Sequence, residues 1–301
     1  MGAKILEGKP VAEQIRKDLI RRMAELQLEG IVPGLAVIMV GDDPASSSYV
    51  RMKGKACQEL GIHSQTLRMP SDYSEASLLH LIDGLNHDPR INGILVQMPV
   101  PGHIDVSKVV RAIDPDKDVD AFHPVNVGKM LIGESDGFLP ATPHGIQEML
   151  MRNGYDVAGR HVVIVGRSNI VGKPLAAILM QKGKGADATV TVCHSRTRDL
   201  GSITSQADIL VCALGKARFI KADMVKEGAV VIDVGSNKVE DPGSPRGYRF
   251  VGDVDFEAVR ERAAAITPVP GGVGPMTIIM LMQNTVLAAE RALERQERPK
   301  V

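Results

Sequence analysis

The chain has 301 residues, of which 44% are hydrophobic and 24% are charged, and this length accommodates two globular domains with buried cores. Lys plus Arg and Asp plus Glu both number 36, so the charge balance indicates neither a nucleic-acid partner nor an anionic membrane surface. Three cysteines, Cys57, Cys193 and Cys212, are too few and too scattered for a disulfide framework or a zinc site. The N-terminus lacks an apolar signal core and no apolar run reaches the length of a membrane span, which favours a cytoplasmic protein.

Strands and helices are predicted to alternate along the first half of the chain. In order, the pattern predicts a helix at 11–29, a strand at 35–41, a helix at 45–60, a strand at 63–69, a helix at 75–86, a strand at 91–97 and a helix at 104–113. The helix at 45–60 has Ser46, Ser47 and Ser48 available for its start. Residues 114–143 are rich in Asp, Gly and Pro, and we expect loops there.

The alternation restarts in the second half. The predicted elements are a linking helix at 144–153, buried strands at 161–165, 188–193, 207–213 and 229–234, and a long C-terminal helix from residue 274. Buried strands separated by helices are typical of doubly wound α/β folds. The buried strand positions of Cys193 and Cys212 favour structural thiols.

The tetrapeptide Pro-Val-Pro-Gly occurs at 99–102 and again at 268–271. Two prolines fix φ and remove two backbone donors, so each copy should form a stiff turn where a strand stops. Ligands of open α/β sheets bind at strand ends. The two copies are therefore predicted to border a ligand cleft.

A second turn, at 166–174, has the form strand, glycine-flanked loop, helix. Gly166 allows a tight exit from the strand, Gly172 allows close backbone approach, and Pro174 suits a first helical turn. The spacing matches neither Gly-x-Gly-x-x-Gly nor a P-loop. The backbone N–H groups could receive a pyrophosphate, and a strand–helix turn without a ligand remains the alternative.

The end of the strand at 188–193 favours NADP over NAD. NAD sites usually have an acidic residue at this point, but here none precedes Asp199. Arg167, Ser195 and Arg196 could instead meet a 2′-phosphate. Solvent-facing arginines are the alternative, which we prefer for Arg198.

Three residues of the first half could form a proton-transfer site. Tyr49 and Lys53 stand four apart on one helix and hence share a face. A buried lysine can serve in proton transfer, and Gln97, at a strand end, could orient it. An ordinary solvated lysine and a water-facing glutamine are the alternatives.

Four aspartates, at 114, 116, 118 and 120, superficially resemble a metal-binding loop. The residues after them lack the glycine and terminal glutamate of an EF-hand, so we expect no metal. One carboxylate that grips a ligand remains possible on this pattern.

Together these segments resemble the bifunctional methylenetetrahydrofolate dehydrogenase/methenyltetrahydrofolate cyclohydrolase family. The matching stretches are Tyr49-Val-Arg-Met-Lys53, Gly93-Ile-Leu-Val-Gln-Met-Pro99, Lys117-Asp-Val-Asp-Ala-Phe-His-Pro124, Pro140-Ala-Thr-Pro143, Val165-Gly-Arg-Ser-Asn-Ile-Val-Gly-Lys-Pro174, Val230-Val-Ile-Asp-Val-Gly-Ser-Asn237 and Thr267-Pro-Val-Pro-Gly-Gly-Val-Gly-Pro-Met-Thr277. They cover nearly the whole chain in order, and the last is highly specific.

The resemblance implies NADP-linked oxidation of 5,10-methylenetetrahydrofolate and hydrolysis of the methenyl product to 10-formyltetrahydrofolate, both in one cleft between two domains. Lys53 would be the essential catalytic lysine, Gln97 would position it, Tyr49 would stack on the folate and Asp120 would anchor the pterin. The implied substrate contacts are Tyr49, Lys53, Val96, Gln97, Met98, Asp120, Pro270, Gly271, Gly274 and Thr277. The implied cofactor contacts are Gly166, Arg167, Ser168, Ile170, Gly172, His194, Ser195, Arg196 and Ser236.

The implied architecture is an α/β catalytic, folate-binding domain over 1–143, a Rossmann-like NADP-binding domain over 144–273, and a C-terminal helix over 274–301 that returns to the first domain. The resemblance also implies a homodimer formed through the cofactor domains. A dehydrogenase with little cyclohydrolase activity and a catalytically silent NADP-binding regulator remain as alternatives.

Three positions depart from the family pattern. Ala121 stands where Gly is usual, Ala141 replaces the Cys of a Pro-Cys-Thr-Pro stretch, and Ser236 occupies a common Ile position beside the cofactor. None belongs to the group formed by Tyr49, Lys53 and Gln97. We therefore expect catalytic activity to be retained.

Overall fold

The computed structural model describes residues 2–244 and 247–297, and it divides into two compact units. Unit 1 combines residues 1–13 with 142–277, and unit 2 combines residues 14–141 with 278–301. The divisions fall inside helices α1 (Gly8–Leu28) and α10 (Val273–Glu297) and near the start of α6 (Ala141–Arg152).

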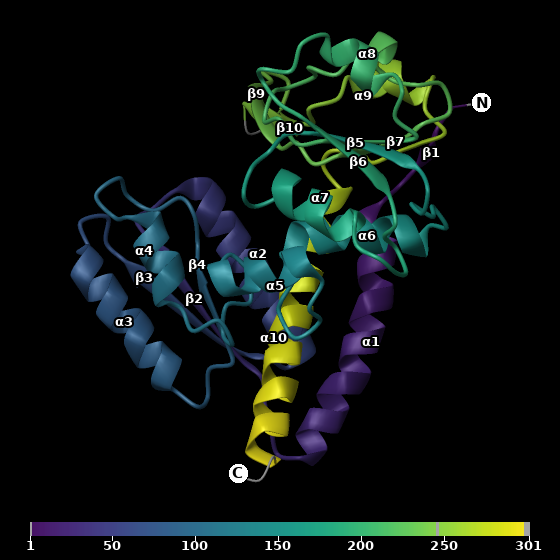
Figure 1. Ribbon diagram of the computed structural model, residues 1–301. Helices are drawn as coiled ribbons and strands as arrows, with labels where there is room; N and C mark the ends of the chain where they lie inside the picture. Colours follow the sequence, from purple (N-terminus) through teal and green to yellow (C-terminus); the bar gives the residue numbers. More distant parts are fainter. Residues whose placement is uncertain (1, 245–246, 298–301) are drawn as a thin grey trace. The chain divides into compact units, whose positions relative to one another are not determined.

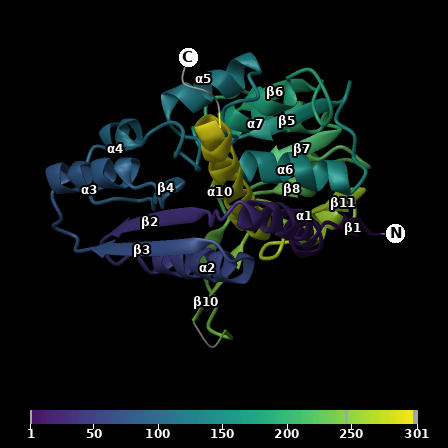
Figure 2. The ribbon, with the colours of Figure 1, turned by 90° about the horizontal axis from the view of Figure 1, so that it is seen from below.

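Unit 2 is built on a three-stranded parallel sheet with β2 in the centre. Its strands, in sheet order, are β3 (His63–Met69), β2 (Gly34–Val40) and β4 (Gly93–Val96). Its helices, besides parts of α1 and α10, are α2 (Pro44–Leu60), α3 (Glu75–His87), α4 (Val106–Ala112) and α5 (Pro124–Ile132). Figure 2 shows α2 on one side of the sheet and α3 with α4 on the other. This layering confirms the predicted α/β class.

The core of unit 2 follows from the apolar character of its central strand. All seven residues of β2 are buried, because helices cover both faces of the sheet. Ile38 of β2 packs in one cluster with Leu78 and Ile82 of α3 and Val109 of α4. Burial of such side chains is the main favourable term in folding.

The C-terminal helix α10 is part of unit 2 over most of its length. It runs beside the unit 2 part of α1 (Figure 1), where Arg22 Nε donates to Glu290 Oε1 at 2.7 Å. Met282 of α10 lies against Cys57 of α2, with 3.5 Å between the two sulfur atoms. The helix therefore contributes both an ion pair and core side chains to this unit.

Unit 1 contains a six-stranded parallel sheet, seen with its helices in Figure 1. Its strands, in sheet order, are β1 (Lys4–Ile5), β11 (Ala265–Ile266), β8 (Val230–Asp233), β7 (Ile209–Cys212), β5 (His161–Val165) and β6 (Thr189–Cys193). Besides α6 and parts of α1 and α10, the remaining elements are α7 (Gly172–Leu179), α8 (Leu200–Thr204), a 3₁₀ turn η1 (Ala222–Met224), α9 (Phe256–Arg260) and an antiparallel hairpin of β9 (Asn237–Glu240) and β10 (Tyr248–Val251).

The order of the strands in unit 1 is that of a doubly wound sheet, since β5 lies between β6 and β7. Every residue of β7 and β8 is buried. Cys193 and Cys212 are free and buried, as predicted, and Cys57 is also free and buried. The thiols of the two strand cysteines therefore serve as core side chains.

Two sequence-based expectations about local structure were wrong, and one element was missed. Helix α2 begins on Asp43, whose side chain accepts from Ser46 N at 2.7 Å, and not on the serines. The segment at 114–143, expected to be loops, contains α5, which begins with the His123 ring accepting from Val125 N. The hairpin at 237–251 was not anticipated, because its strands carry charged and exposed residues.

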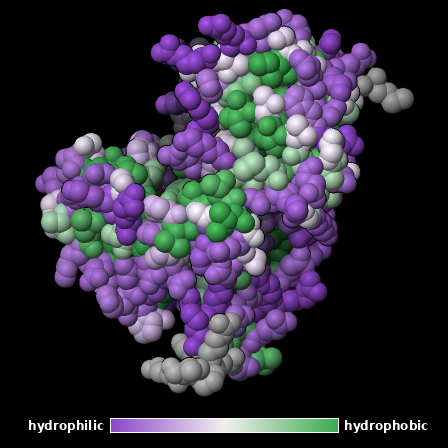
Figure 3. Space-filling view, viewed as in Figure 1, coloured by the Kyte–Doolittle hydropathy of each residue, from purple (hydrophilic) through white to green (hydrophobic). Residues whose placement is uncertain are grey.

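Hydrophilic residues cover most of the face shown in Figure 3, and hydrophobic residues gather around α5. Val125, Leu131 and Ile132 of this helix are exposed. Within residues 2–244 and 247–297, no helix combines the length and the continuous hydrophobicity needed to cross a membrane.

Two glycines of unit 2 give a matched test of the backbone. Gly84→Ala in α3 should raise the free energy of unfolding by up to about 1 kcal/mol, since alanine favours the helix and its Cβ would meet no atom within 4 Å. Gly61→Ala, at the end of α2, has equally open space, but its φ of +75° is left-handed. That change should lower the free energy by about 1–2 kcal/mol. Urea denaturation measures both free energies of unfolding. If the two substitutions changed the free energy in the same direction, the helical backbone at Gly84 or the left-handed backbone at Gly61 would be wrong.

Candidate functional site

The centre of the site in unit 2 is a hydrogen-bonded pair, Lys53 and Gln97. Lys53 lies on α2 and is only 7% exposed, and Gln97 directly follows β4. Lys53 Nζ donates to Gln97 Oε1 at 2.9 Å. The Gln97 amide is held in turn, because its Nε2 donates to Met98 O at 2.9 Å. This second bond leaves Oε1 as the atom that faces the lysine.

Burial and opposite charge act against each other at Lys53 and Asp120. Burial lowers the pKa of Lys53, and the negative charge of Asp120 partly counteracts this. Burial raises the pKa of Asp120 to about 6, the Lys53 charge opposes that rise, and Asp118 adds to it. The two groups are therefore electrostatically coupled: burial favours the neutral form of each, and the charge of each favours the charged form of the other.

Tyr49 lies one turn before Lys53 on α2, and its side chain is 37% exposed. A ring in this position offers a face on which a planar ligand can stack. Val96 is buried at the end of β4, and Met98, after Gln97, is half-buried. Tyr49 therefore shares a helix face with Lys53, and Val96 and Met98 flank Gln97, the hydrogen-bond partner of the lysine.

The loop that carries Asp120 has an unusual backbone. Ala121, the next residue, is fully buried and has a φ of +59°, in the left-handed region that favours glycine. The buried Asp118 carboxylate accepts from His123 N at 2.8 Å and from Asn126 Nδ2 at 3.0 Å. The glycine-to-alanine departure is thus accommodated with the left-handed conformation intact.

The glycine turn of unit 1 has the close backbone contacts predicted for it. A Cβ on Gly166 would lie 2.2 Å from Ala213 O, and one on Gly172 would lie 2.1 Å from Gly166 O. Arg167, Ser168 and Ile170 between them are exposed. No side chain larger than hydrogen fits at either glycine, so the loop packs closely on the residue after β7 and on its own backbone. A dinucleotide-binding turn depends on such close packing.

The end of β6 lies beside that turn. Gly166 N donates to Cys193 O at 2.9 Å, which joins the turn to the last residue of β6. After it, the His194 ring accepts from Arg196 N at 3.1 Å, and Ser195 and Arg196 are exposed. These polar groups are therefore accessible next to the glycine turn.

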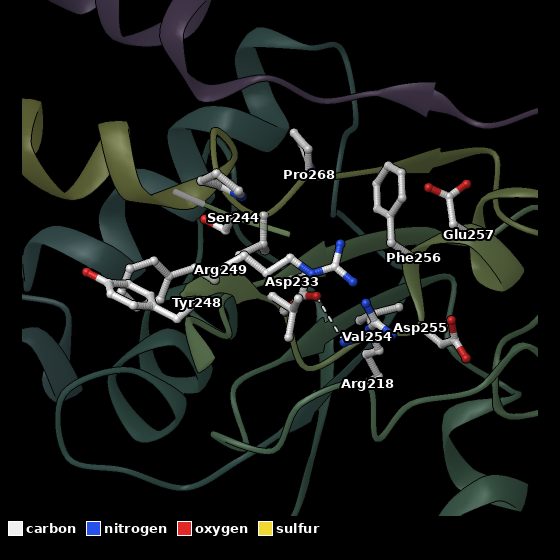
Figure 4. Close-up of a pocket in the computed structure, with 15 residues that line it drawn as sticks. Arg218, Asp233, Ser244, Tyr248, Arg249, Val254, Asp255, Phe256, Glu257 and Pro268 are labelled. Atoms are coloured by element: carbon white, nitrogen blue, oxygen red, sulfur yellow. Dashed lines mark hydrogen bonds between the residues drawn. The ribbon is translucent and has the colours of Figure 1, made fainter. Parts of the chain in front are cut away.

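Two buried aspartates of unit 1 were not singled out from the sequence. Asp233 ends β8 and accepts from the backbone N–H groups of Gly235, Asp253 and Val254, each at 2.9 Å (Figure 4 shows the bond to Val254). Burial raises the pKa of Asp233 to about 6. Together these bonds tie the end of β8 to the segment after the hairpin.

Asp253 organises the segment after β7 in the same way. It accepts from the backbone N–H groups of Leu214, Gly215 and Lys216 and from Asn237 Nδ2. Ser236, one of the implied cofactor contacts, lies between Asp233 and Asp253 in the sequence and is exposed. Asp233 had one signal in the sequence, its place at the end of an apolar run, which resembles an ordinary turn. Asp253 had none, because the strand before it is largely exposed.

The second Pro-Val-Pro-Gly turn leads into α10. Gly271 has a φ of +107° and its carbonyl accepts from Gly8 N at 2.9 Å, while Thr277 Oγ1 lies 2.8 Å from Thr142 Oγ1. Gly274 is exposed in the first turn of the helix. The cis peptide precedes Pro99 in the first copy but Pro270 in the second, so the two turns differ in conformation.

A pocket of about 820 Å³ lies between this turn and the hairpin, and Figure 4 shows its lining. Pro270 belongs to it, with Pro268 and Val269. The hairpin contributes Tyr248 and Arg249. Gly166 and its neighbours do not line this pocket, so the predicted cofactor turn is a separate feature of unit 1.

The structure therefore joins Lys53 to Gln97, couples Lys53 to Asp120 and places Tyr49 one turn away, all within unit 2. Within unit 1 it places the end of β6 against the glycine turn. Tyr248 and Arg249 could not be foreseen, because the hairpin that carries them was not predicted.

Comparisons with known proteins agree with both units. The family model for the tetrahydrofolate dehydrogenase/cyclohydrolase catalytic domain matches residues 6–120, and that for the NAD(P)-binding domain of the same family matches residues 140–293. The bifunctional protein FolD of Dehalococcoides mccartyi (strain CBDB1) is 59% identical over 295 residues, which cover 97% of this chain and 99% of that protein.

Two solved structures are similar over nearly their whole length. The bifunctional FolD of Campylobacter jejuni is 46% identical, with a TM-score of 0.90, and the match covers 96% of this chain and 99% of that one. The FolD of Trypanosoma brucei, solved with NADP cofactor and inhibitor, is 39% identical, with a TM-score of 0.91. The match covers 97% of this chain and 99% of that one. On sequence and fold alike, this chain belongs to the tetrahydrofolate dehydrogenase/cyclohydrolase family.

Proposed function

We propose that this chain oxidises 5,10-methylenetetrahydrofolate with NADP and hydrolyses the 5,10-methenyl product to 10-formyltetrahydrofolate. The observation that carries the proposal is the buried Lys53 ammonium, bonded to Gln97 and coupled to Asp120, within the region matched by the family's catalytic domain. Relatives of this chain are named as bifunctional enzymes, and their full-length similarity supports both activities.

Lys53 acts in the hydrolytic step. Because its pKa is lowered by burial, the amine exchanges a proton more readily near neutral pH than an exposed lysine does. It polarises the water that attacks the amidinium carbon, or accepts a proton from that water as the new C–O bond forms. Gln97 Oε1 accepts one ammonium hydrogen at 2.9 Å and so fixes the direction of the others.

The folate substrate is held by Asp120, by Tyr49 and by the further contacts that the family resemblance implies. Asp120 accepts hydrogen bonds from the polar edge of the pterin, and Tyr49 stacks against the folate. The remaining substrate contacts are Val96, Met98, Pro270, Gly271, Gly274 and Thr277. Hydride transfer needs no acid or base from the chain, only an aligned donor and acceptor.

The cofactor is held in unit 1, where the residues fit a dinucleotide. Gly166 and Gly172, at which no larger residue would fit, let the backbone of the turn pack closely. The start of α7 would then receive the pyrophosphate. Arg167 and Ser168 bind the phosphates, and Ser195 with Arg196 meets the 2′-phosphate. Ile170, His194 and Ser236 complete the contacts. NADP, when bound, supplies the hydride acceptor.

We also propose the wider setting of the enzyme, with the family resemblance as its support. The chain acts in one-carbon metabolism in the cytoplasm, as a homodimer formed through the cofactor domains, with neither nucleic acid nor membrane as a partner. The proposed domain boundaries are 143 and 273. The two compact units divide close by, at 141/142 and 277/278, but residues 1–13 belong to the unit of the cofactor domain. Sedimentation equilibrium tests the dimer directly.

Lys53→Met is expected to abolish the cyclohydrolase step, because the side chain loses the ammonium that acts on water. A coupled assay with methylenetetrahydrofolate and NADP follows NADPH formation and then the decay of the methenyl absorbance. Lys55→Met, in which an exposed lysine of the same helix is changed, is the matched control and should leave the decay rate unaltered. Retained hydrolysis in Lys53→Met would refute the assigned role, and no NADPH from the unmodified chain would refute the dehydrogenase.

Lys53→Met should also raise the pKa of Asp120 above its value of about 6, because the lysine charge is what favours the carboxylate. A carbon-13 NMR titration of the aspartate carboxyls measures this shift. Lys55→Met should leave the Asp120 pKa where it is. An unchanged or lower pKa in Lys53→Met would show that the two groups are not coupled.

Arg167→Ala combined with Ser195→Ala should weaken NADP more than NAD, since both side chains are assigned to phosphates and one of them to the 2′-phosphate. Charge-assisted phosphate contacts contribute about 1.5–3 kcal/mol each, so removing two of them should lower the NADP affinity by about 100-fold or more. Fluorescence titration with each cofactor gives the two affinities. Arg198→Ala, exposed in the same segment, is the control. Equal losses for NADP and NAD would contradict the 2′-phosphate assignment.

A further inference from the structure

The segment 117–120, which ends in Asp120, is held from several sides within unit 2. Lys117 Nζ donates to Leu85 O at 3.0 Å and to Asp88 O at 2.9 Å, at the end of α3. The Lys117 carbonyl accepts from Ile94 N of β4 at 2.8 Å. The first residue of the segment is therefore fixed to a helix and to the sheet.

The second residue, Asp118, fixes the segment to α5. Its carboxylate accepts from the N–H groups of Phe122 and His123 and from the Asn126 side chain. The Asn126 amide also donates to Pro115 O at 2.9 Å. These bonds close the loop on itself around the buried carboxylate.

The third residue, Val119, is held by α10, a helix far away in sequence. Asn284 is 2% exposed, and its Nδ2 donates to Val119 O and to Leu139 O, both at 2.8 Å. One amide nitrogen thus satisfies two backbone carbonyls from separate segments. Buried carbonyls of this kind are costly to leave without a donor.

We propose that Asn284 is a positioning residue of the folate site, which holds the backbone at Val119 so that the Asp120 carboxylate stays beside Lys53. The proposal rests on the role assigned to Asp120 above. Val119 O is an atom of the peptide that joins Val119 to Asp120, so a shift there moves the Asp120 side chain directly. Ala121, on the C-terminal side of Asp120, has a left-handed backbone. A non-glycine residue keeps that conformation only where its surroundings hold the backbone in place.

Asn284 also differs from the other anchors in what it connects. Lys117 and Asp118 bond within residues 85–126, whereas Asn284 brings in α10, which lies 165 residues from Val119 in the chain. A displacement of about 1 Å at a catalytic group can reduce the rate 100-fold. The two bonds from α10 therefore suit a residue that sets the Asp120 position.

A double-mutant cycle between Asn284 and Asp120 tests the proposal. Asn284→Ala should raise the KM for the folate substrate about tenfold and leave the KM for NADP within about twofold. In the Asp120→Asn background the same change should add less than about twofold, because the group that Asn284 positions is already altered. Asn284→Ser, which keeps one donor, is the second variant and replaces Asn284→Ala if that variant fails to fold. It should raise the folate KM by a smaller factor.

Thr285→Val is the matched control for a purely structural effect. Thr285 is equally buried on α10, but its hydroxyl bonds only to Leu281 O of the same helix, at 2.9 Å. This variant should lose stability without a change in the folate KM. The proposal is overturned if Thr285→Val raises the folate KM as much as the Asn284 variants do, or if folded Asn284 variants leave it unchanged. Full multiplication of the two effects in the double variant would overturn it as well.

The same measurements separate failure of the inference from failure of the proposed function. If Asp120→Asn alone leaves the folate KM unchanged, the role assigned to Asp120 is wrong, and the positioning inference falls with it. If Asp120→Asn raises the folate KM and the Asn284 variants do not, only the positioning inference is wrong.

Discussion

The buried ammonium of Lys53 is the constraint on which the site in unit 2 depends. An ammonium group removed from water needs compensation, which here comes from the Gln97 amide at 2.9 Å and from the charge of Asp120. Gln97 can supply its oxygen only because its nitrogen is engaged by Met98 O. Asp120 can supply its charge only from a loop held in place by α3, α5 and α10. A single buried charge thus connects most elements of the unit.

In unit 1 the corresponding constraint is steric. The backbone at Gly166 and Gly172 passes so close to its neighbours that a methyl group would overlap carbonyl oxygens. Asp233 and Asp253 then hold the loops after β7 and β8 through backbone N–H groups, which fixes the carboxyl end of the sheet. In unit 1, therefore, close backbone packing and backbone hydrogen bonds hold the loops at the carboxyl end of the sheet. In unit 2, a buried charge and its partners determine the arrangement of the site.

The sequence was informative where one kind of signal dominated. Fully buried strands such as β2 and β7 are unbroken apolar runs, and helices such as α1 and α10 show helical spacing, so both types were predicted close to their observed bounds. The spacing of Tyr49 and Lys53 and the strand end at Gln97 were enough to nominate the group around the lysine.

The features that were missed depend on contacts distant in sequence or on uncommon local chemistry. Helix α5 starts on a histidine ring, which is not a usual cap, within a segment rich in turn residues. The hairpin of β9 and β10 carries exposed charges and thus lacks the apolar pattern of a core strand. Asp233, Asp253 and Asn284 gain their meaning only from backbone groups that the fold brings to them, so no spacing along the chain could reveal them.

The burial of Lys53 also determines how the site responds to ionic strength. Dissolved ions screen exposed charges over about 8 Å at physiological salt, but they screen a pair inside the protein far less. Lys53 is only 7% exposed, so counter-ions have little access to the attraction between its ammonium and Asp120. Burial of the ammonium thus makes this attraction less sensitive to dissolved salt than an ion pair between two fully exposed side chains would be.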